Sequence, residues 1–386
     1  GLGKTSLALR IAAHAALTEK KTVALFSMEM SELQVVQRLI SMEAGIDGNR
    51  IDIGTSIGIT LAPSDGNDAD KLMKNADLAL YRSKSSGRRA FTFFAPEMDD
   101  EAQARRSLEV GLRRALSDDA LELYYQPTVC LETKQAKGFE AALRWRHPER
   151  GLIAPDELLS IAEDMGLLAE IGDWTLKQAC AQAARWPAAL HVAVNVSSPQ
   201  FLQRGLTESL LQALANSGLP PHRLELEIAE AVLHEDPAIA ILHQLRQLGV
   251  RVTLDGFGSR HCSLSSVRAF PFDKIKIAKA FVADIERSKE TRAIIEAMVT
   301  LGSRLQTAIV AEGIDDFDRM NHVRDLGCIE GQGFLLGPSL AAADVENFLR
   351  VRTASAQADA RAADARAAFS PECGESGELP ASSQAA

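Results

Sequence analysis

The sequence lacks the features of membrane-bound, exported and disulfide-bonded proteins. No apolar run approaches the ~20 residues that a membrane-spanning helix needs, and no signal peptide is visible. The cysteines are scattered, odd in number and form no CxxC pair; they are Cys130, Cys180, Cys262, Cys328 and Cys373. We therefore expect a cytoplasmic protein without a membrane segment, whose thiols are buried or inert in a reducing compartment.

The sequence also lacks an excess of positive charge. Its 386 residues carry 42 Lys and Arg against 52 Asp and Glu, a formal net charge of -10. Nucleic-acid binding needs a concentrated basic face, so a nucleic-acid partner is not expected, although a few local Arg or Lys can still hold an anionic ligand. With 46% hydrophobic and 24% charged residues, the composition is globular, and the length allows two or three domains.

Residue patterns divide the chain into five parts. Residues 1–48 open on a glycine-rich motif without Met, so we expect that an upstream piece is missing. Residues 49–97 have the pattern of a strand (52–61), a helix (69–83) and a second strand (90–94). Residues 98–118 hold a charged linker helix (100–116). Residues 119–350 alternate strand-like and helical runs, which is typical of a parallel α/β sheet. The tail, 351–386, has almost no large apolar residues, so we expect it to be disordered.

Polar residues recur at the ends of the strand-like runs between 119 and 350. Six runs end on such a residue and a last run begins with one; the residues are Glu140, Asn195, Glu227, Asp255, Lys276, Glu312 and Gln332. In a (β/α)₈ barrel the carboxyl ends of the strands form the rim on which catalytic groups collect. The pattern therefore predicts a TIM-like barrel, preceded by partial α/β fragments, with these side chains at its mouth.

The residue types at this rim indicate oxygen-coordinated metal chemistry. Four of them, Glu140, Asn195, Glu227 and Asp255, are hard oxygen donors with no His or Cys among them, which favours Mg²⁺ or Mn²⁺ over zinc. Glu312 and Lys276 add a base or second-metal ligand and a positive charge. Such a set suits phosphodiester hydrolysis, and Arg144, four residues after Glu140, is placed to meet a phosphate.

Each of these residues also has an ordinary structural interpretation. A strand-end carboxylate is commonly a helix cap or a turn acceptor, and Asn195 before Ser197 and Pro199 can form a turn. Lys276 can be a solvated charge, and Gln126 an ordinary strand residue. The functional interpretation depends on the whole set.

Eight short motifs in this region resemble the EAL family of cyclic-di-GMP phosphodiesterases. They are YQP at 125–127, FEAALRW at 139–145, NVS at 195–197, ELEIAE at 225–230, LDGFG at 254–258, FDKIKI at 272–277, AEG at 311–313 and QGF at 332–334. The resemblance implies a metal-dependent enzyme that converts cyclic-di-GMP to the linear dinucleotide, with a homodimer formed through the barrel.

The resemblance also assigns roles to residues. The first metal ion is implied on Glu140, Asn195, Glu227 and Asp255, and catalysis with the second metal site on Lys276 and Glu312. The dinucleotide is implied to contact Gln126, Arg144 and Gln332, while Glu230 supports a loop.

The sequence departs from the family pattern at several of these motifs. The Glu-Ala-Leu signature reads EAA at 140–142, and the loop after Asp255 reads SRHCS at 259–263. The Asp-Asp pair reads Asp255-Gly256, and Lys-Ile-Asp reads KIA at 276–278, so two carboxylates of the second metal site are missing. We expect weakened hydrolysis, with the alternative that the domain is an inactive module binding cyclic-di-GMP or a protein.

The two leading segments resemble parts of other families. Motifs TSIGI at 55–59 and NADLALYRSKSSGR at 75–88 resemble the end of a GGDEF diguanylate cyclase domain, which implies triphosphate contacts for Lys84 and Arg88. We favour the structural explanation, that basic residues at the end of a surface helix complement its dipole. GLGKT at 1–5 and VALFSMEMS at 23–31 resemble a DnaB-type replicative helicase. Both segments are incomplete, so neither cyclase nor helicase activity is expected, and a fusion that folds only in its barrel is a third interpretation.

Overall fold

The structure is a computed structural model, which describes residues 56–85, 90–118, 120–202, 205–235, 237–257 and 270–352. It divides into two compact units, Gly1–Leu108 and Glu109–Ala386. The helicase-like segment 1–48 and residues 353–386 of the tail lie outside the described residues, so those predictions stay predictions. Among the residues described, no helix is long and apolar enough to cross a bilayer.

The described part of the first unit is a two-stranded parallel sheet with helices. Strand β1 (Ile57–Ile59) pairs with β2 (Phe91–Phe93), and α3 (Ala69–Ser85) connects them. Helix α4 (Glu97–Ala115) follows, with acidic residues in its first turn and Arg113 and Arg114 in its last, an arrangement that complements the helix dipole. The four elements agree with the predicted order, although β1 is shorter than the predicted strand, of which 52–55 are outside the described residues. The boundary between the units falls inside α4.

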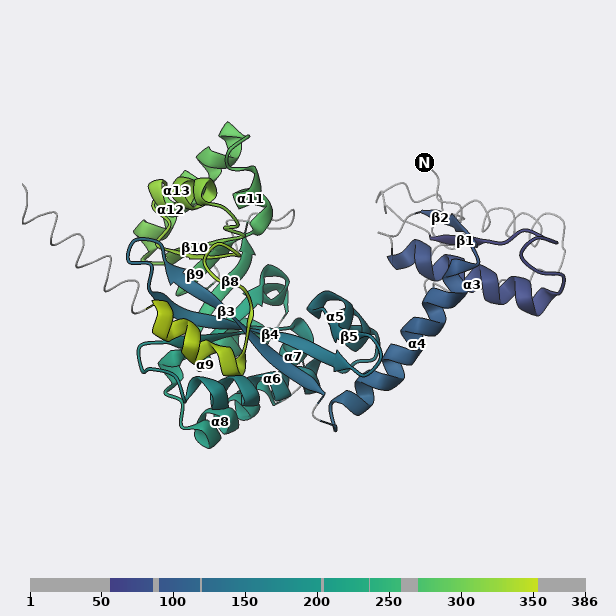
Figure 1. Cartoon of the computed structure of the whole chain (residues 1–386), viewed down its shortest axis with the longest axis horizontal. Coiled ribbons are helices and arrows are strands. Elements are labelled where there is room, and N and C mark those ends of the chain that lie inside the picture. The colour runs from purple at the N-terminus through teal and green to yellow at the C-terminus, as the bar shows by residue number, and fades with distance from the viewer. Residues whose placement is uncertain are drawn as a thin grey trace, which may run out of the picture. The chain divides into compact units, whose positions relative to one another are not determined.

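The second unit is a closed barrel (Figure 1). Eight strands form the ring in the order β3, β4, β6, β7, β8, β9, β10 and β11, with β11 pairing back to β3. Their bounds are Leu121–Cys130, Ala136–His147, His191–Val196, Leu224–Ala229, Arg251–Phe257, Lys274–Ile277, Ala308–Glu312 and Glu330–Gln332. Two short strands, β5 (Gly151–Ile153) and β12 (Leu340–Ala341), extend the sheet beside β4 and β3. The predicted TIM-like barrel is therefore confirmed.

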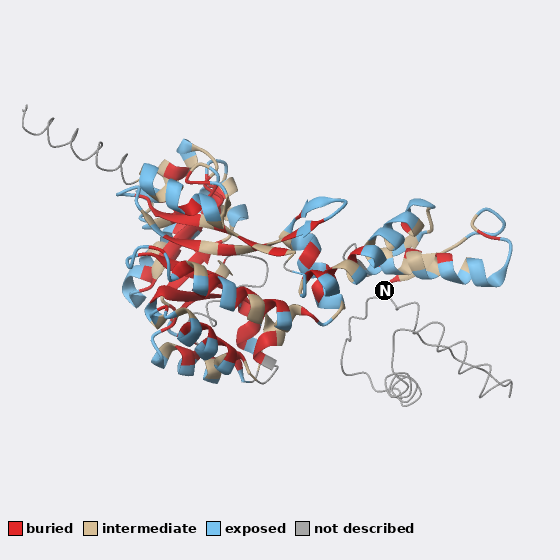
Figure 2. Cartoon of the chain, turned by 60° about the horizontal axis from the view of Figure 1, so that its bottom comes forward, coloured by how far each residue is buried: buried red, intermediate tan, exposed pale blue. Residues whose placement is uncertain are grey.

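Helices surround the ring and turn their exposed faces outward (Figure 2). Among the described residues, the α-helices around the ring are α5 (Pro155–Asp164), α6 (Leu168–Ala183), α7 (Ser198–Leu202), α8 (Leu206–Ser217), α9 (Ala238–Gln247), α11 (Lys279–Asp284), α12 (Lys289–Leu305) and α13 (Phe317–Asp325). The described part of the unit also has three short 3₁₀ turns: η1 (Pro221–Arg223), η2 (Glu230–His234) and η3 (Ala342–Asp344). Strands β7 and β9 are buried along nearly their whole length because helices cover their outer side.

The first barrel strand runs opposite to the others. Strand β3 is antiparallel to both of its neighbours, β4 and β11, whereas the remaining ring pairs are parallel. The uniform parallel rhythm expected from the sequence is therefore wrong at this strand. The reason is local: β3 and β4 are joined by a short turn at 131–135, which allows only an antiparallel hairpin.

Two predicted strand ends also differ from the structure. Strand β4 does not end at Glu140 but continues to His147, because its outer half pairs with β3 and β5 beyond the ring. Gln332 ends β11 instead of beginning the last strand. The register nevertheless places Gln126 of β3 opposite Glu140, and Glu312 opposite Gln332, so these residues share one end of the barrel.

Candidate active site

A buried lysine organises the predicted site residues at the carboxyl end of the parallel strands. The Lys276 Nζ atom lies 2.8 Å from Glu140 Oε2, 3.0 Å from Glu227 and 2.7 Å from Glu312 Oε1. Only 3% of the Lys276 side chain is exposed. Strands β4, β7, β9 and β10 thus each contribute one charged group to the same point, as the recurring strand-end residues predicted.

Amide side chains connect the same carboxylates on the other side. Asn195 Nδ2 donates to Glu140 Oε1 at 2.8 Å and lies 3.4 Å from Glu227 Oε2. Gln332 Nε2 donates to Glu140 Oε2 at 2.8 Å and to Gln126 Oε1 at 3.0 Å. Seven of the ten predicted site residues therefore belong to one hydrogen-bonded network: Gln126, Glu140, Asn195, Glu227, Lys276, Glu312 and Gln332.

The network separates the carboxylates by their affinity for protons. Burial alone would raise the pKa of Glu140, but the Lys276 ammonium and the two donated amide hydrogens outweigh it and lower that pKa. Burial, followed by the charge of Glu140, raises the pKa of Glu227 well above its ordinary value. Burial also raises the pKa of Glu312, whereas the surrounding carboxylates outweigh burial at Lys276 and hold its pKa well above the ordinary value.

Asp255 is placed beside this network with an unused acceptor. Its Oδ1 atom is buried and accepts no hydrogen bond from any residue that the structure describes. Asp255 lies on β8, paired in parallel with β7 next to Ala229, and its charge acts on Glu227, Glu312 and Lys276. A buried carboxylate oxygen without a partner is unfavourable, so the site has capacity for a further positive group.

The donor set fits a hard divalent cation in chemistry and charge. Glu140, Glu227, Asp255 and Glu312 face the single ammonium of Lys276, and oxygen donors of this kind are preferred by Mg²⁺ and Mn²⁺. Among the described residues, no three His, Cys, Asp or Glu side chains are arranged as a ready metal cluster. In the structure, the Lys276 ammonium lies between the carboxylates, and a cation would be held by Glu140, Asn195, Glu227 and Asp255.

A cavity of about 500 Å³ opens above the network. Its lining includes Gln126, Glu140, Glu312 and Gln332 at the floor and Arg144 on the outer half of β4. Arg144 donates to the Leu143 carbonyl at 2.9 Å and lies over the Tyr124 ring, 5.7 Å from its centroid. Glu230, the last of the ten predicted site residues, begins η2 and is buried. Its role in supporting a loop stays a prediction. The loop at 259–263 is outside the described residues, so the effect of its unusual sequence also stays a prediction.

A second polar layer, which sequence reasoning missed, fills the barrel beneath the network. Lys274 Nζ lies 3.1 Å from Glu225 Oε2 and 2.8 Å from Glu330 Oε2, and Thr253 Oγ1 donates to Glu225 Oε1 at 2.6 Å. Lys274 also contacts His191 Nε2 at 3.1 Å. We call this set, Glu225, Lys274, Glu330, His191 and Thr253, the lower layer. Glu225 and Lys274 precede Glu227 and Lys276 by two residues, the period with which strand side chains return to one face.

The lower layer holds its groups in fixed protonation states. Burial and the neighbouring Lys274 lower the pKa of His191 to about 4, so the imidazole is neutral at pH 7 and accepts from Lys274. Burial opposes ionisation of Glu225, but Lys274 outweighs it and lowers the pKa of that carboxyl to about 2. This layer therefore pairs its own charges internally.

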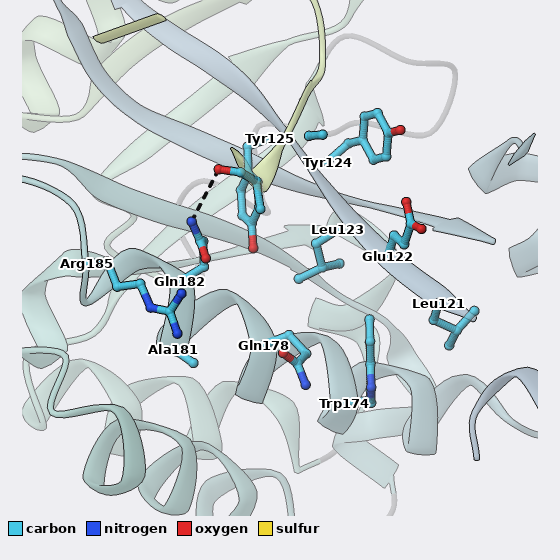
Figure 3. A pocket seen from close by; sticks show the side chains of 12 residues that line it. Leu121, Glu122, Leu123, Tyr124, Tyr125, Trp174, Gln178, Ala181, Gln182 and Arg185 are labelled. Carbon is cyan, nitrogen blue, oxygen red and sulfur yellow. Dashed lines mark hydrogen bonds between the residues drawn. The ribbon is translucent and has the colours of Figure 1, made fainter. Parts of the chain in front are cut away.

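A second cavity, of about 360 Å³, lies outside the ring between β3 and α6 (Figure 3). Trp174, Gln178 and Arg185 of the α6 region line it, and Gln182 Nε2 donates to the Ala342 carbonyl at 3.5 Å. It contains none of the predicted site residues. The mouth of the barrel is therefore the candidate active site.

Comparison with known proteins agrees with the fold and the site. The family model for the EAL domain matches residues 109–339. The chain is 43% identical over 309 residues to an uncharacterized signaling protein of Caulobacter vibrioides, with 79% of this chain and 38% of that protein covered. It is 39% identical over 309 residues to the bifunctional diguanylate cyclase/cyclic di-GMP phosphodiesterase MucR of Pseudomonas aeruginosa, covering 78% and 45%.

Solved structures give the same result. The PaMucR phosphodiesterase in complex with c-di-GMP superposes with a TM-score of 0.59 at 38% identity, covering 62% of this chain and 99% of that one. The chain belongs to the EAL domain family. It spans less than half of the length of the two curated relatives.

A second family model matches the start of the chain. The model for the DnaB-like helicase C terminal domain matches residues 1–76, which agrees with the helicase resemblance of the opening segment. The match extends beyond residue 48 into β1 and α3 of the first unit.

Proposed function

We propose that this chain binds cyclic-di-GMP in the mouth cavity and hydrolyses it slowly, with a divalent metal ion, to the linear dinucleotide. The observation that supports the proposal best is the convergence of Glu140, Asn195, Glu227, Lys276 and Glu312 on one point, within an EAL domain. Relatives named as cyclic-di-GMP phosphodiesterases share this domain.

The chain's own residues divide the work of the reaction. A divalent ion, Mg²⁺ or Mn²⁺, held by Glu140, Asn195, Glu227 and Asp255 would supply positive charge beside the scissile phosphodiester. Glu312, whose pKa is raised by burial, accepts a proton from the attacking water. Lys276 stays protonated and holds the Glu312 carboxylate in place. Gln126, Gln332 and Arg144 orient the dinucleotide from the cavity wall.

Slow turnover follows from two positions at the mouth. Gly256 follows Asp255, and Ala278 follows β9, where the EAL pattern has carboxylates of the second metal site. Without them, less positive charge can be gathered around the transition state, and each ~1.4 kcal/mol of lost stabilisation slows the reaction tenfold. The same observation favours the second candidate function, a module that binds cyclic-di-GMP or a protein without hydrolysing it.

Hydrolysis and binding measured on one sample test both candidates. We expect slow appearance of the linear dinucleotide with Mg²⁺ or Mn²⁺, and none after chelation. Binding without product would favour the module, whereas neither binding nor product in a folded sample would reject both. We do not propose cyclase or helicase activity, and the homodimer through the barrel is a separate proposal for light scattering to test.

A further inference from the structure

Lys279 is a charged residue of the mouth to which neither the sequence motifs nor the comparisons assign a role. It begins α11 directly after Ala278, and its side chain lines the mouth cavity with Glu312, Gly313 and Asp315. Its Nζ atom pairs with Asp315 Oδ2 at 3.2 Å, and 65% of the side chain is exposed. Exposed ion pairs of this kind contribute little stability, so a ligand can replace Asp315 as partner at small cost.

The neighbouring backbone is shaped around this lysine. A Cβ atom at Gly313 would lie 2.4 Å from Lys279 Cγ, and Gly313 has a φ of +73°. Only glycine therefore leaves room for the Lys279 methylenes to cross the end of β10. Asp315 is fixed as well, because its Oδ1 accepts from the Phe334 backbone N–H at 3.2 Å. The loops after β9, β10 and β11 together position the ammonium at the rim.

The charge of the cavity shows what Lys279 can bind. Of the described residues that line it, Arg144 and Lys279 carry positive charge, whereas Glu140, Glu312 and Asp315 carry carboxyl groups. Lys276 lies deeper and is already paired with three carboxylates. An anionic ligand entering the mouth therefore meets its attractive charge at Arg144 and Lys279.

These two cations come from opposite sides of the ring. Arg144 belongs to β4, and Lys279 follows β9, which is four strands from β4 in either direction around the eight-stranded barrel. A cyclic dinucleotide carries two phosphodiester groups on opposite sides of its macrocycle. We propose that Lys279 binds one of these phosphates while Arg144 binds the other, so that the mouth selects a ligand with two separated anionic groups. This inference rests on the proposed function.

Lys279 also lies next to one of the two positions at which a carboxylate of the second metal site is missing. Lys279 is adjacent to Ala278, and the positive charge that a second metal ion would bring to this wall is supplied by the protein itself. Removing the lysine should therefore weaken ligand binding more than it changes folding.

The test is the affinity of the full chain for fluorescent cyclic-di-GMP in Mg²⁺, with product followed in the same sample. We expect Lys279→Met to weaken binding about tenfold, the usual scale for one charge-assisted contact, and Lys279→Arg to stay within about threefold of the unchanged chain. Lys177→Met, on the exposed face of α6, is the matched control and should bind normally. Thermal unfolding should be unchanged in all three variants.

Two further arms separate a phosphate contact from a general effect. Combining Lys279→Met with Arg144→Met should multiply the two losses if the residues hold different phosphates, and added salt should weaken binding by the unchanged chain more than by Lys279→Met. Normal affinity of Lys279→Met would overturn the inference. A double variant that binds as tightly as the single variant with the lower affinity would overturn it as well. Failure of the unchanged chain to bind would instead overturn the proposed function.

Discussion

The two polar layers inside the barrel are built from the same residue types but differ in charge balance. In the lower layer, Lys274 forms ion pairs with Glu225 Oε2 and Glu330 Oε2, and Thr253 donates to the other oxygen of Glu225. In the network above it, one ammonium faces four carboxylates, and the Asp255 Oδ1 atom has no hydrogen-bond partner among the described residues.

This difference distinguishes a structural layer from a reactive one. The lower layer is closed, since the side chains of His191, Glu225 and Lys274 are 7% exposed or less. The upper network borders a cavity of about 500 Å³ from which a cation and a ligand can enter. Excess negative charge beside an opening favours cation binding, whereas paired charge in a closed core favours a single fold.

The largest expected effect is on turnover, from Lys276→Met. Removing this ammonium leaves Glu140, Glu227 and Glu312 without their shared partner. We expect hydrolysis to fall by about a thousandfold or more, equivalent to ~4 kcal/mol. Turnover is measured on folded protein, with Lys177→Met as control; activity within tenfold of the unchanged chain would contradict the assigned role.

Lys274→Met tests whether the lower layer is structural. The buried Glu225 and the partly exposed Glu330 lose their counter-charge, so the free energy of unfolding should fall by about 3 kcal/mol. Because this layer is closed, added Mg²⁺ should not restore the loss. Denaturant unfolding with and without Mg²⁺ measures it, and full restoration by the metal would show that the two layers are not distinct.

Acid should weaken the lower layer in a defined pH range. The pKa of His191 is lowered to about 4. Between about pH 6.5 and 4, this histidine is therefore protonated in the unfolded chain but neutral in the folded chain. Stability therefore falls as pH drops from about 6.5 towards 4, by up to about 3 kcal/mol. The lowered pKa of Glu225, about 2, also makes stability fall as the pH drops below 4.5.

Unfolding curves at several pH values check this expectation. His191→Asn should flatten the dependence between about pH 6.5 and 4, and His222→Gln, at an exposed position, should leave it unchanged. An identical slope in His191→Asn would place the titrating group elsewhere.

The smallest expected effect is a gain. Gly256→Asp combined with Ala278→Asp should raise turnover about tenfold by restoring carboxylates to the second metal site. A Cβ at Gly256 meets no atom of the described residues within 4 Å, although its φ of +66° makes the substitution strained. If the double variant binds cyclic-di-GMP but gains nothing in turnover, a different feature of the mouth limits the rate.

The sequence predicted the reactive layer better than the structural one. Glu140, Asn195, Glu227, Lys276 and Glu312 stand out because each follows an apolar run, and the barrel brings them together. Strand ends were less predictable: β4 continues past Glu140 because it pairs beyond the ring, and such pairing leaves no local signal.

The lower layer was not predicted, although the spacing of its residues along the strands indicates it. Glu225 and Lys274 lie two residues before Glu227 and Lys276, so the period of two places all four inside the barrel. The spacing does not identify the partners of Lys274. Glu330 and His191 come from distant strands, and their contacts with Lys274 depend on closure of the ring.

The most direct test of this account is hydrolysis of cyclic-di-GMP by the purified, folded chain, first with Mg²⁺ and then with Mn²⁺, with ligand binding measured on the same sample. The account predicts binding and slow, metal-dependent release of the linear dinucleotide, abolished by chelation. Binding without any product would contradict hydrolysis and leave a ligand-binding module, and the absence of both would contradict the assignment of the mouth as the functional site.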